Sequence, residues 1–309
     1  MSERNGRWAA IAASVLAAAA VCAAALPAQA QAQTLDRVRT SSALKFGYDP
    51  DARPFSFDAQ GKPDGYAVAL CNRIADSLRA QLNLPKLDVE WVPLSGDAKL
   101  RAIQDGTADL VCAAEPVTLE RRQQVSFSLP IFPSGTGALL SASAPLALRE
   151  VLQYGEPSSR PVWRGAPART ILEHKTFSSI SGTTSEGWLS DKIKSFQLAA
   201  TATPVTNYQQ GIERVLDGSS AVLFGDMPVL MDAAARSDSS GNLIVLERHF
   251  TYEPLGLELV RGDEDFRLAV DRALSQAYAA QDFRAFFTTW FGPPDDAVVT
   301  FFRQTALPE

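Results

Sequence analysis

Cysteine and histidine are scarce in this sequence: its 309 residues include three cysteines and two histidines. The histidines, His174 and His249, do not combine with the cysteines at any spacing by which proteins hold structural zinc. The chain also lacks a G-x-S-x-G nucleophile elbow and a phosphate-binding P-loop. These absences argue against a zinc site, an elbow-type hydrolase and a P-loop nucleotide site, and we expect neither a metal ion nor a cofactor.

Basic residues are fewer than acidic ones, 29 Lys and Arg against 35 Asp and Glu, and the formal net charge is −6 at pH 7. A negatively charged surface argues against nucleic acid and against an anionic lipid surface as partners. The apolar and charged fractions, 46% and 21%, are those of an ordinary globular protein. Composition thus points away from polyanionic partners and leaves the function open.

Residues 1–30 have the three parts of a cleavable signal peptide. Arg4 and Arg7 give it a basic start. Residues 8–26 are uncharged and rich in alanine, and Ala28-Gln29-Ala30 is a small-residue cleavage site. A retained membrane anchor is the alternative, but alanine partitions weakly into lipid. We therefore expect export, cleavage and a periplasmic location for a mature chain of about 280 residues, which suggests one large or two medium domains.

The mature chain alternates predicted strands and helices. In its first part, apolar spacing predicts strands at 44–48, 87–92 and 110–114, and helices at 66–82 and 97–104. In its second part it predicts strands at 176–180, 196–205, 221–224 and 252–260, and helices at 183–193, 210–216, 265–279, 282–291 and from Pro228. This order is typical of two doubly wound α/β units. The proline-rich stretch 141–170 between them is predicted to be an irregular surface loop.

Two further features belong to this pattern. Thr183-x-x-Glu186 and Thr206-x-x-Gln209 both have the form of capping boxes at helix starts. The tail after Pro294 carries apolar residues and is expected to pack on the body of the protein.

Cys71 and Cys112 are the two cysteines that remain after removal of the signal peptide. Two cysteines in an oxidising compartment suggest one disulfide. Cys71 lies early in a predicted helix and Cys112 late in a predicted strand of the same unit. Two buried free thiols are the alternative.

The segment Asp109–Pro130 places a cation at the edge where ligands of open α/β sheets bind. A buried strand ends near Pro116, and Thr118 can cap a short helix that carries Arg121. The helix macrodipole disfavours a cation in a first turn, so Arg121 does not serve helix stability there. A plain surface salt bridge is the alternative interpretation.

The order strand, T-x-x-R, F-S-x-P resembles the signature of family 3 periplasmic solute-binding proteins. The likeness is greatest to the glutamate/aspartate-binding branch, in which a cysteine precedes that arginine by nine residues, as Cys112 precedes Arg121, and a G-T-T-S-E sequence follows, as at 182–186. The resemblance runs from about Leu44 to the C-terminus. It implies a clamshell of two doubly wound lobes joined by two hinge strands, with residues 34–136 plus 256–309 in lobe 1 and residues 137–255 in lobe 2.

The resemblance also implies roles for single residues. Arg121 would pair with the α-carboxylate of a ligand, because its planar fork suits a carboxylate. Thr183 would offer a backbone amide at a helix start, and Asp226 would receive the α-ammonium group. Asp49 would help to hold the ligand side chain. The other expected ligand-binding residues are Thr184, Tyr208, Ser134 and Glu115.

Several positions depart from the family pattern. Pro116 has no N–H where relatives offer one, and Ala114 replaces a hydroxyl residue. Against the glutamate/aspartate branch, Asp49 and Gly137 replace arginines and Tyr208 replaces a histidine. Because a buried, unpaired carboxylate costs several kcal/mol, we expect an acidic ligand side chain to be excluded. A neutral, polar or modestly cationic amino acid, or a related small carboxylate, is expected instead.

Three functions are compatible with these expectations. The first is the periplasmic binding component of an amino-acid ABC importer, a monomer without enzymatic activity whose partners are the ligand and a membrane permease. The second is a binding protein that reports to a sensor without transport. The third is an enzyme similar to cyclohexadienyl dehydratases, which needs a general acid in the cleft. Glu115 is the candidate for that role, and we interpret it as a carboxylate on the cleft rim.

Overall fold

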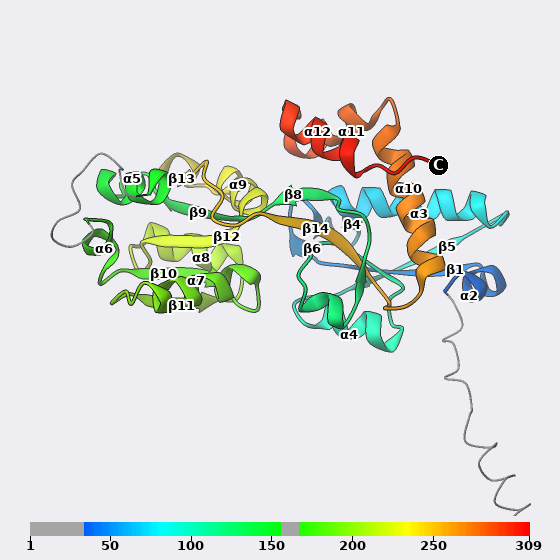
Figure 1. Cartoon of the computed structure of the whole chain (residues 1–309), viewed down its shortest axis with the longest axis horizontal. Helices are drawn as coiled ribbons and strands as arrows, with labels where there is room; N and C mark the ends of the chain where they lie inside the picture. Colours follow the sequence, from blue (N-terminus) through cyan, green and yellow to red (C-terminus); the bar gives the residue numbers. More distant parts are fainter. Residues whose placement is uncertain (1–33, 156–166) are drawn as a thin grey trace, which may run out of the picture.

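The computed structural model describes residues 34–155 and 167–309. The predicted signal peptide, residues 1–30, lies outside the described residues. The described chain forms two α/β lobes that lie side by side and are joined by extended strands (Figure 1). The predicted clamshell architecture is confirmed.

Lobe 1 is built on a sheet with the strand order β5-β1-β6-β14-β7, and β8 pairs with β14. Its strands are β1 (Ala43–Tyr48), β5 (Asp88–Pro93), β6 (Leu110–Pro116), β7 (Ser126–Phe127), β8 (Phe132–Ser134) and β14 (Glu253–Leu259). Its helices are α2 (Thr34–Ser41), α3 (Tyr66–Gln81), α4 (Ala98–Asp105), α10 (Glu264–Ala279), α11 (Phe283–Phe291) and α12 (Asp296–Thr305). A small sheet joins β2 (Asp51–Ala52), β3 (Ser56–Asp58) and β4 (Pro63–Asp64).

Lobe 2 is built on a sheet with the strand order β11-β10-β12-β9-β13. Its strands are β9 (Thr136–Ser141), β10 (Thr176–Ile180), β11 (Thr201–Val205), β12 (Val222–Asp226) and β13 (Leu243–Val245). Its helices are α5 (Leu146–Tyr154), α6 (Pro167–Leu172), α7 (Thr184–Ser195), α8 (Tyr208–Leu216) and α9 (Met227–Arg236). Both sheets are mixed, because β14 in lobe 1 and β9 and β13 in lobe 2 run antiparallel to their neighbours.

The chain passes between the lobes along two neighbouring strands. β8 and β14 pair antiparallel, with Ser134 opposite Glu253. The backbone N–H of Thr136 donates to the Thr251 hydroxyl at 2.8 Å, which ties the two crossings together. Gly135 lies between them, and a Cβ there would come within 1.9 Å of the Thr251 carbonyl oxygen. The lobe boundaries at 136/137 and 255/256 stay a prediction about which residues move together.

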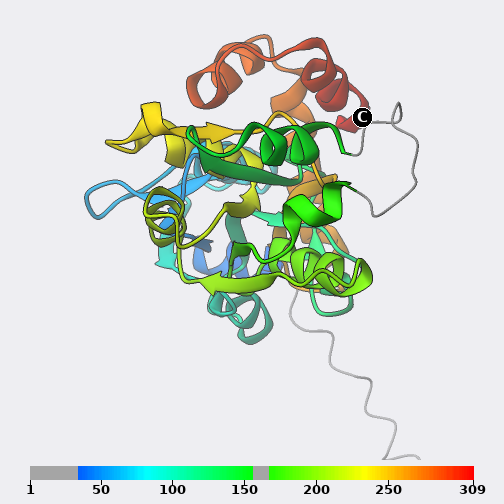
Figure 2. The same ribbon diagram turned by 90° about the vertical axis from the view of Figure 1, so that its left-hand side faces the viewer.

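The core of lobe 1 is rich in aromatic side chains. Tyr66 is fully buried, and its hydroxyl donates to the Ile131 carbonyl at 3.0 Å. The C-terminal helices α11 and α12 lie along one edge of this lobe (Figure 1, Figure 2). Phe302 of α12 is buried, with its ring centroid 4.7 Å from that of Phe283. The expected packing of the tail on the body is therefore confirmed.

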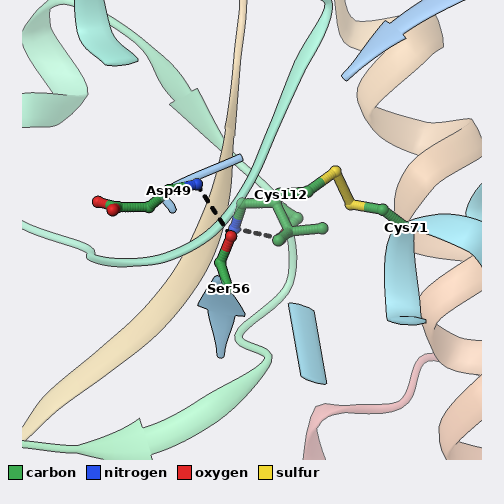
Figure 3. Close-up of a disulfide and its surroundings, with 6 residues drawn as sticks. Asp49, Ser56, Cys71 and Cys112 are labelled. Atoms are coloured by element: carbon green, nitrogen blue, oxygen red, sulfur yellow. Dashed lines mark hydrogen bonds between the residues drawn. A yellow bond between two sulfur atoms is a disulfide. The ribbon is translucent and has the colours of Figure 1, made fainter. Parts of the chain in front are cut away.

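A disulfide joins Cys71 of α3 to Cys112 of β6, with an S–S distance of 2.05 Å (Figure 3). Both cysteines are fully buried in the core of lobe 1. The bridge predicted from the two remaining cysteines is confirmed. It fastens a covering helix to the strand whose C-terminal end carries Glu115.

Three local predictions were wrong. Part of the predicted irregular loop is helix α5, whose Leu148 and Leu152 are buried; Pro145 precedes this helix and does not interrupt it. Residues 156–166 of that predicted loop lie outside the described residues. The predicted strand at 196–205 is shorter, because α7 extends to Ser195 and β11 begins at Thr201. The second helix cap is Asn207, one residue after the predicted Thr206. Of the helices in residues 34–155 and 167–309, none is long and apolar enough to cross a membrane.

Candidate functional site

A cleft of about 530 Å³ lies between the lobes, within the size range of sites for small ligands. The ends of β1 and β6 line it from lobe 1, and the ends of β10 and β12 line it from lobe 2. Ligands of open α/β sheets bind at these carboxyl ends. The charged residues that line the cleft are Asp49, Asp51, Asp97, Lys99, Glu115, Arg121, Asp226, Glu253 and Glu258.

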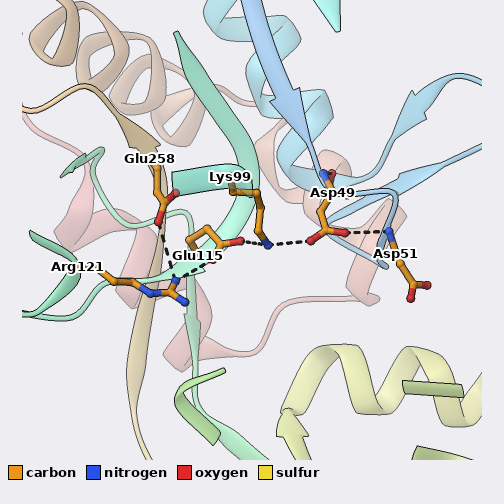
Figure 4. Close-up of polar contacts among 7 residues, drawn as sticks. Asp49, Asp51, Lys99, Glu115, Arg121 and Glu258 are labelled. Atoms are coloured by element: carbon orange, nitrogen blue, oxygen red, sulfur yellow. Dashed lines mark hydrogen bonds and ion pairs between the residues drawn. The ribbon is translucent and has the colours of Figure 1, made fainter. Parts of the chain in front are cut away.

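The charged side chains of lobe 1 form a row of alternating sign (Figure 4). Arg121 Nη1 donates to Glu115 Oε2 at 2.8 Å. The other oxygen of Glu115 lies 2.5 Å from Lys99 Nζ, which also donates to Asp49 Oδ2 at 2.8 Å. These residues come from different parts of lobe 1: Asp49 follows β1, Lys99 lies in α4, Glu115 is the next-to-last residue of β6, and Arg121 begins a 3-10 turn at Arg121–Gln123.

Burial alone would favour the uncharged forms of these groups, but their mutual attraction keeps them ionised. Burial acts to lower the pKa of Lys99, yet Glu115 and Asp49 outweigh it and raise that pKa above its usual value. Burial likewise acts to raise the pKa of Glu115, and Lys99 and Arg121 together bring it below its usual value. Glu115 is 7% exposed. Its interpretation as a carboxylate on the cleft rim was therefore wrong.

Glu258 is a buried acid that the sequence analysis did not identify. It lies in β14, is 2% exposed, and approaches Arg121 at 4.0 Å through one oxygen. Its other oxygen, Oε2, is buried and has no hydrogen-bond partner in the part of the chain that the structure describes. Burial, together with the neighbouring charge of Glu115, raises the pKa of Glu258 to about 7. A single charged residue inside the apolar run 255–260 was the sequence signal that could have identified it.

We expect Glu258→Gln to raise the free energy of unfolding by about 1–2 kcal/mol at pH 8 and to leave it nearly unchanged at pH 4. The pKa of Glu258 is raised in the folded state, to about 7 from 4.5. Between these values the unfolded chain releases a proton that the folded chain retains, so the wild type loses stability as pH rises through that window. Urea unfolding at pH 4, 6 and 8 measures the difference.

The exposed Glu90 of β5 offers a matched control in the same sheet. Glu90→Gln should change stability by the same small amount at all three pH values. If the stability of Glu258→Gln depends on pH in the same way as that of the wild type, Glu258 does not titrate in this window.

In lobe 2, helix α7 begins at the cleft. Thr183 is its N-cap, and its side chain accepts a hydrogen bond from the Glu186 N–H, as the capping box predicted. The reciprocal bond differs by one residue, because the Glu186 carboxylate accepts from the Gly182 N–H at 2.7 Å. The Thr184 hydroxyl donates to Glu253 Oε2 at 2.8 Å. The start of α7 is therefore connected to the strand crossing between the lobes.

Asp226 lies at the end of β12 and at the N-cap position of α9, where its side chain makes no cap hydrogen bond. Its carboxylate instead accepts a short hydrogen bond from the Ser134 hydroxyl. Its backbone N–H donates to the Tyr208 hydroxyl at 3.3 Å. Burial raises the pKa of Asp226 to about 7 against the opposing Ser134 bond, and the charges of Glu253 and Glu115 add to the rise.

The structure brings the predicted ligand-binding residues to one cleft. Seven of them line it directly: Asp49, Glu115, Arg121, Thr183, Thr184, Tyr208 and Asp226. Ser134 reaches it through its bond to Asp226. Lys99, Glu253 and Glu258 were not predicted. Among the residues at 34–155 and 167–309, no group of three or more His, Cys, Asp or Glu is arranged to hold a metal ion.

Comparison with known proteins agrees with this geometry. A curated L-glutamate/L-aspartate-binding protein of Pseudomonas aeruginosa is 24% identical over 278 residues, which cover 89% of this chain and 85% of that protein. The crystal structure of an ancestral amino acid-binding protein, a precursor of cyclohexadienyl dehydratase, is 24% identical with a TM-score of 0.66, and the match covers 84% of this chain and 99% of that one. An ancestral cationic amino acid solute-binding protein is 26% identical with a TM-score of 0.58, and the same shares of the two chains are covered.

The model of one protein family matches residues 44–293, which is most of the chain. This range includes both sheets, both crossings between the lobes and every charged residue that lines the cleft. The chain therefore belongs to the bacterial extracellular solute-binding proteins, family 3.

Proposed function

We propose that this protein captures an amino acid, or a closely related small solute with an amino group, in its interlobe cleft and delivers it to an ABC importer. The observation that carries the proposal is the position of Asp226. Its partly buried carboxylate faces the cleft, makes no helix-cap bond and has the Ser134 hydroxyl as its hydrogen-bond donor. An ammonium group of the ligand would supply the missing positive charge.

Closure of the clamshell follows from the two-lobed site. A ligand that contacts Asp226 in lobe 2 and the charged row in lobe 1 gains more contacts when the lobes approach. Such a ligand shifts the population toward the closed state. We propose that residues 34–136 plus 256–309 move as one body and residues 137–255 as the other, and that the permease recognises the closed monomer in the periplasm.

We propose binding without catalysis. A dehydratase needs a general acid, and Glu115, the one candidate for that role in the sequence analysis, is held ionised between Lys99 and Arg121. Incubation with prephenate and with arogenate, followed by assay of the aromatic products, tests this. Turnover above the uncatalysed rate would overturn the proposal and direct attention to Asp226 and Glu258 as the acid.

We expect Asp226→Asn to remove most of the thermal stabilisation that the best ligand of a panel gives. A ligand at a hundredfold excess over its Kd adds about 2.7 kcal/mol of stability, and loss of a charge-assisted contact should remove most of this. The measurement is a thermal-shift panel of the twenty amino acids, small amines and common organic acids. Asp191→Asn makes the same chemical change at an exposed position of α7. This variant should keep the full thermal shift. Equal shifts in both variants would exclude Asp226 as the ammonium site.

A further inference from the structure

The cations of the cleft are already bound by the protein's own carboxylates. Lys99 contacts both Asp49 and Glu115. Arg121 donates to Glu115 and has Glu258 at 4.0 Å as a second acid. Both contacts of Arg121 are made through Nη1, so a ligand carboxylate could reach the guanidinium only beside Glu115. There it would share the positive charge with a buried carboxylate of the protein, which weakens its net attraction to the site.

Several uncharged donors of the cleft are also committed. Pro116 has no N–H, and the N–H of Val117 donates to the Pro254 carbonyl at 2.9 Å. At the start of α7, the Thr183 hydroxyl donates to the Ile180 carbonyl at 2.7 Å. The Thr184 hydroxyl donates to Glu253, so an anion of the protein already lies beside this helix start. The Val117 N–H and these two hydroxyls are therefore already engaged and do not offer a hydrogen bond to an α-carboxylate.

Acceptors, in contrast, are in excess. Seven carboxylates and two cations are among the lining residues named above. Asp49 and Glu115 match the two cations, which leaves Asp51, Asp97, Asp226 and Glu253 without a basic partner among the lining residues. Glu258 has only a distant contact, at 4.0 Å, with the Arg121 that Glu115 already binds. The acids of the two lobes face a shared space, because Glu115 and Glu258 of lobe 1 and Asp226 of lobe 2 line the same cleft.

We propose that the ligand is a small organic cation with two separated amino or guanidino groups, held by Asp226 on one side and by the acids of lobe 1 on the other. In this proposal an α-carboxylate adds nothing to recognition. The inference rests on the proposed function of solute capture in the same cleft. It extends that function from amino acids to their decarboxylated amines.

Matched ligand pairs test the inference directly. Calorimetry at pH 8 on the wild-type protein compares lysine with cadaverine, ornithine with putrescine and arginine with agmatine, because each pair differs in the α-carboxylate alone. We expect the amine to bind at least as tightly as its amino acid in at least one pair, and glutamate to give no heat. If the amino acid binds at least tenfold more tightly than its amine in all three pairs, the inference is overturned and the proposed function stays intact. Absence of binding by all amino acids and amines would overturn both.

Glu115→Gln provides a second test. The substitution removes the anion that occupies Arg121 and should shift the amine-to-amino-acid preference at least tenfold toward the ligand with a carboxylate. Glu150→Gln makes the same change at an exposed position of α5 and should leave the amine-to-amino-acid preference as in the wild type. If Glu115→Gln leaves the amine-to-amino-acid preference unchanged, Glu115 does not block a carboxylate site. Circular dichroism of the ligand-free variant checks that it is folded, and the wild-type ligand pairs decide the proposal whatever that check gives.

Discussion

Replacing Lys99 with methionine is expected to lower the free energy of unfolding by about 3–5 kcal/mol near pH 7, because it leaves buried carboxylates without their cation. The Lys99 side chain is 13% exposed, and its ammonium group contacts Asp49 and Glu115, whose side chains are 12% and 9% exposed. Methionine lacks the terminal ammonium group but keeps most of the length and packing of the lysine chain, so the loss reports mainly on charge. Urea unfolding followed by circular dichroism measures it.

A double variant separates charge from packing. Adding Glu115→Gln to Lys99→Met removes one of the stranded carboxylates and should recover at least about 1 kcal/mol, since contacting residues in one ion-pair network are not additive. If the double variant is as unstable as Lys99→Met or less stable, the destabilisation comes from packing and the charged row does not stabilise lobe 1.

Lys86 provides the control with the same chemistry at the surface. It pairs with Asp88 at 2.7 Å, but the two side chains are 75% and 63% exposed. Exposed ion pairs contribute about 0–1 kcal/mol. Lys86→Met should therefore cost less than about 1 kcal/mol, and a comparable loss in both variants would contradict the role of burial.

The elements that the sequence predicted well are those with a local signal. The helix at Tyr66–Gln81 and the strand at Leu110–Pro116 have long apolar patterns, and both lie within a residue or two of their predicted positions. The disulfide could be predicted because two cysteines in an exported chain leave one pairing. Local signals failed where two residues compete: Thr206 and Asn207 can both cap α8, and the backbone selects Asn207.

The charged row could not be predicted in the same way, because its members meet only in the folded chain. Lys99 lies 50 residues after Asp49 in the sequence and lies in a helix whose position was predicted, yet nothing local indicates that its side chain turns inward. Glu115 was placed on the rim for the same reason: the sequence indicates its strand but not the two cations that hold its side chain inside. Which buried charges pair depends on the tertiary structure, and the local sequence pattern does not indicate it.

Loss of the disulfide is expected to lower the free energy of unfolding by about 4 kcal/mol in the double variant Cys71→Ala, Cys112→Ala, because the bridge closes a long loop in the unfolded chain. The two cysteines are 41 residues apart. Guanidinium unfolding of the double variant and of the wild type measures the loss. Reduced wild-type protein is the matched control: it lacks the bond but keeps both sulfur atoms in the core, so its difference from the double variant isolates packing. A change below about 1 kcal/mol on reduction would mean that the unfolded chain is already compact around this loop.

The disulfide should matter far less for binding than for stability. Cys112 lies in the same strand as Glu115, but β6 is also paired with β1 on one side and with β14 on the other. These neighbours hold the register of β6 without the bridge, and the contacts of Glu115 with Lys99 and Arg121 hold its side chain. We therefore expect the reduced protein, at temperatures where it stays folded, to bind the best ligand within about threefold of the oxidised affinity, since the bridge acts mainly on the unfolded chain. A folded, reduced protein that no longer binds would show instead that the bridge positions the charged row.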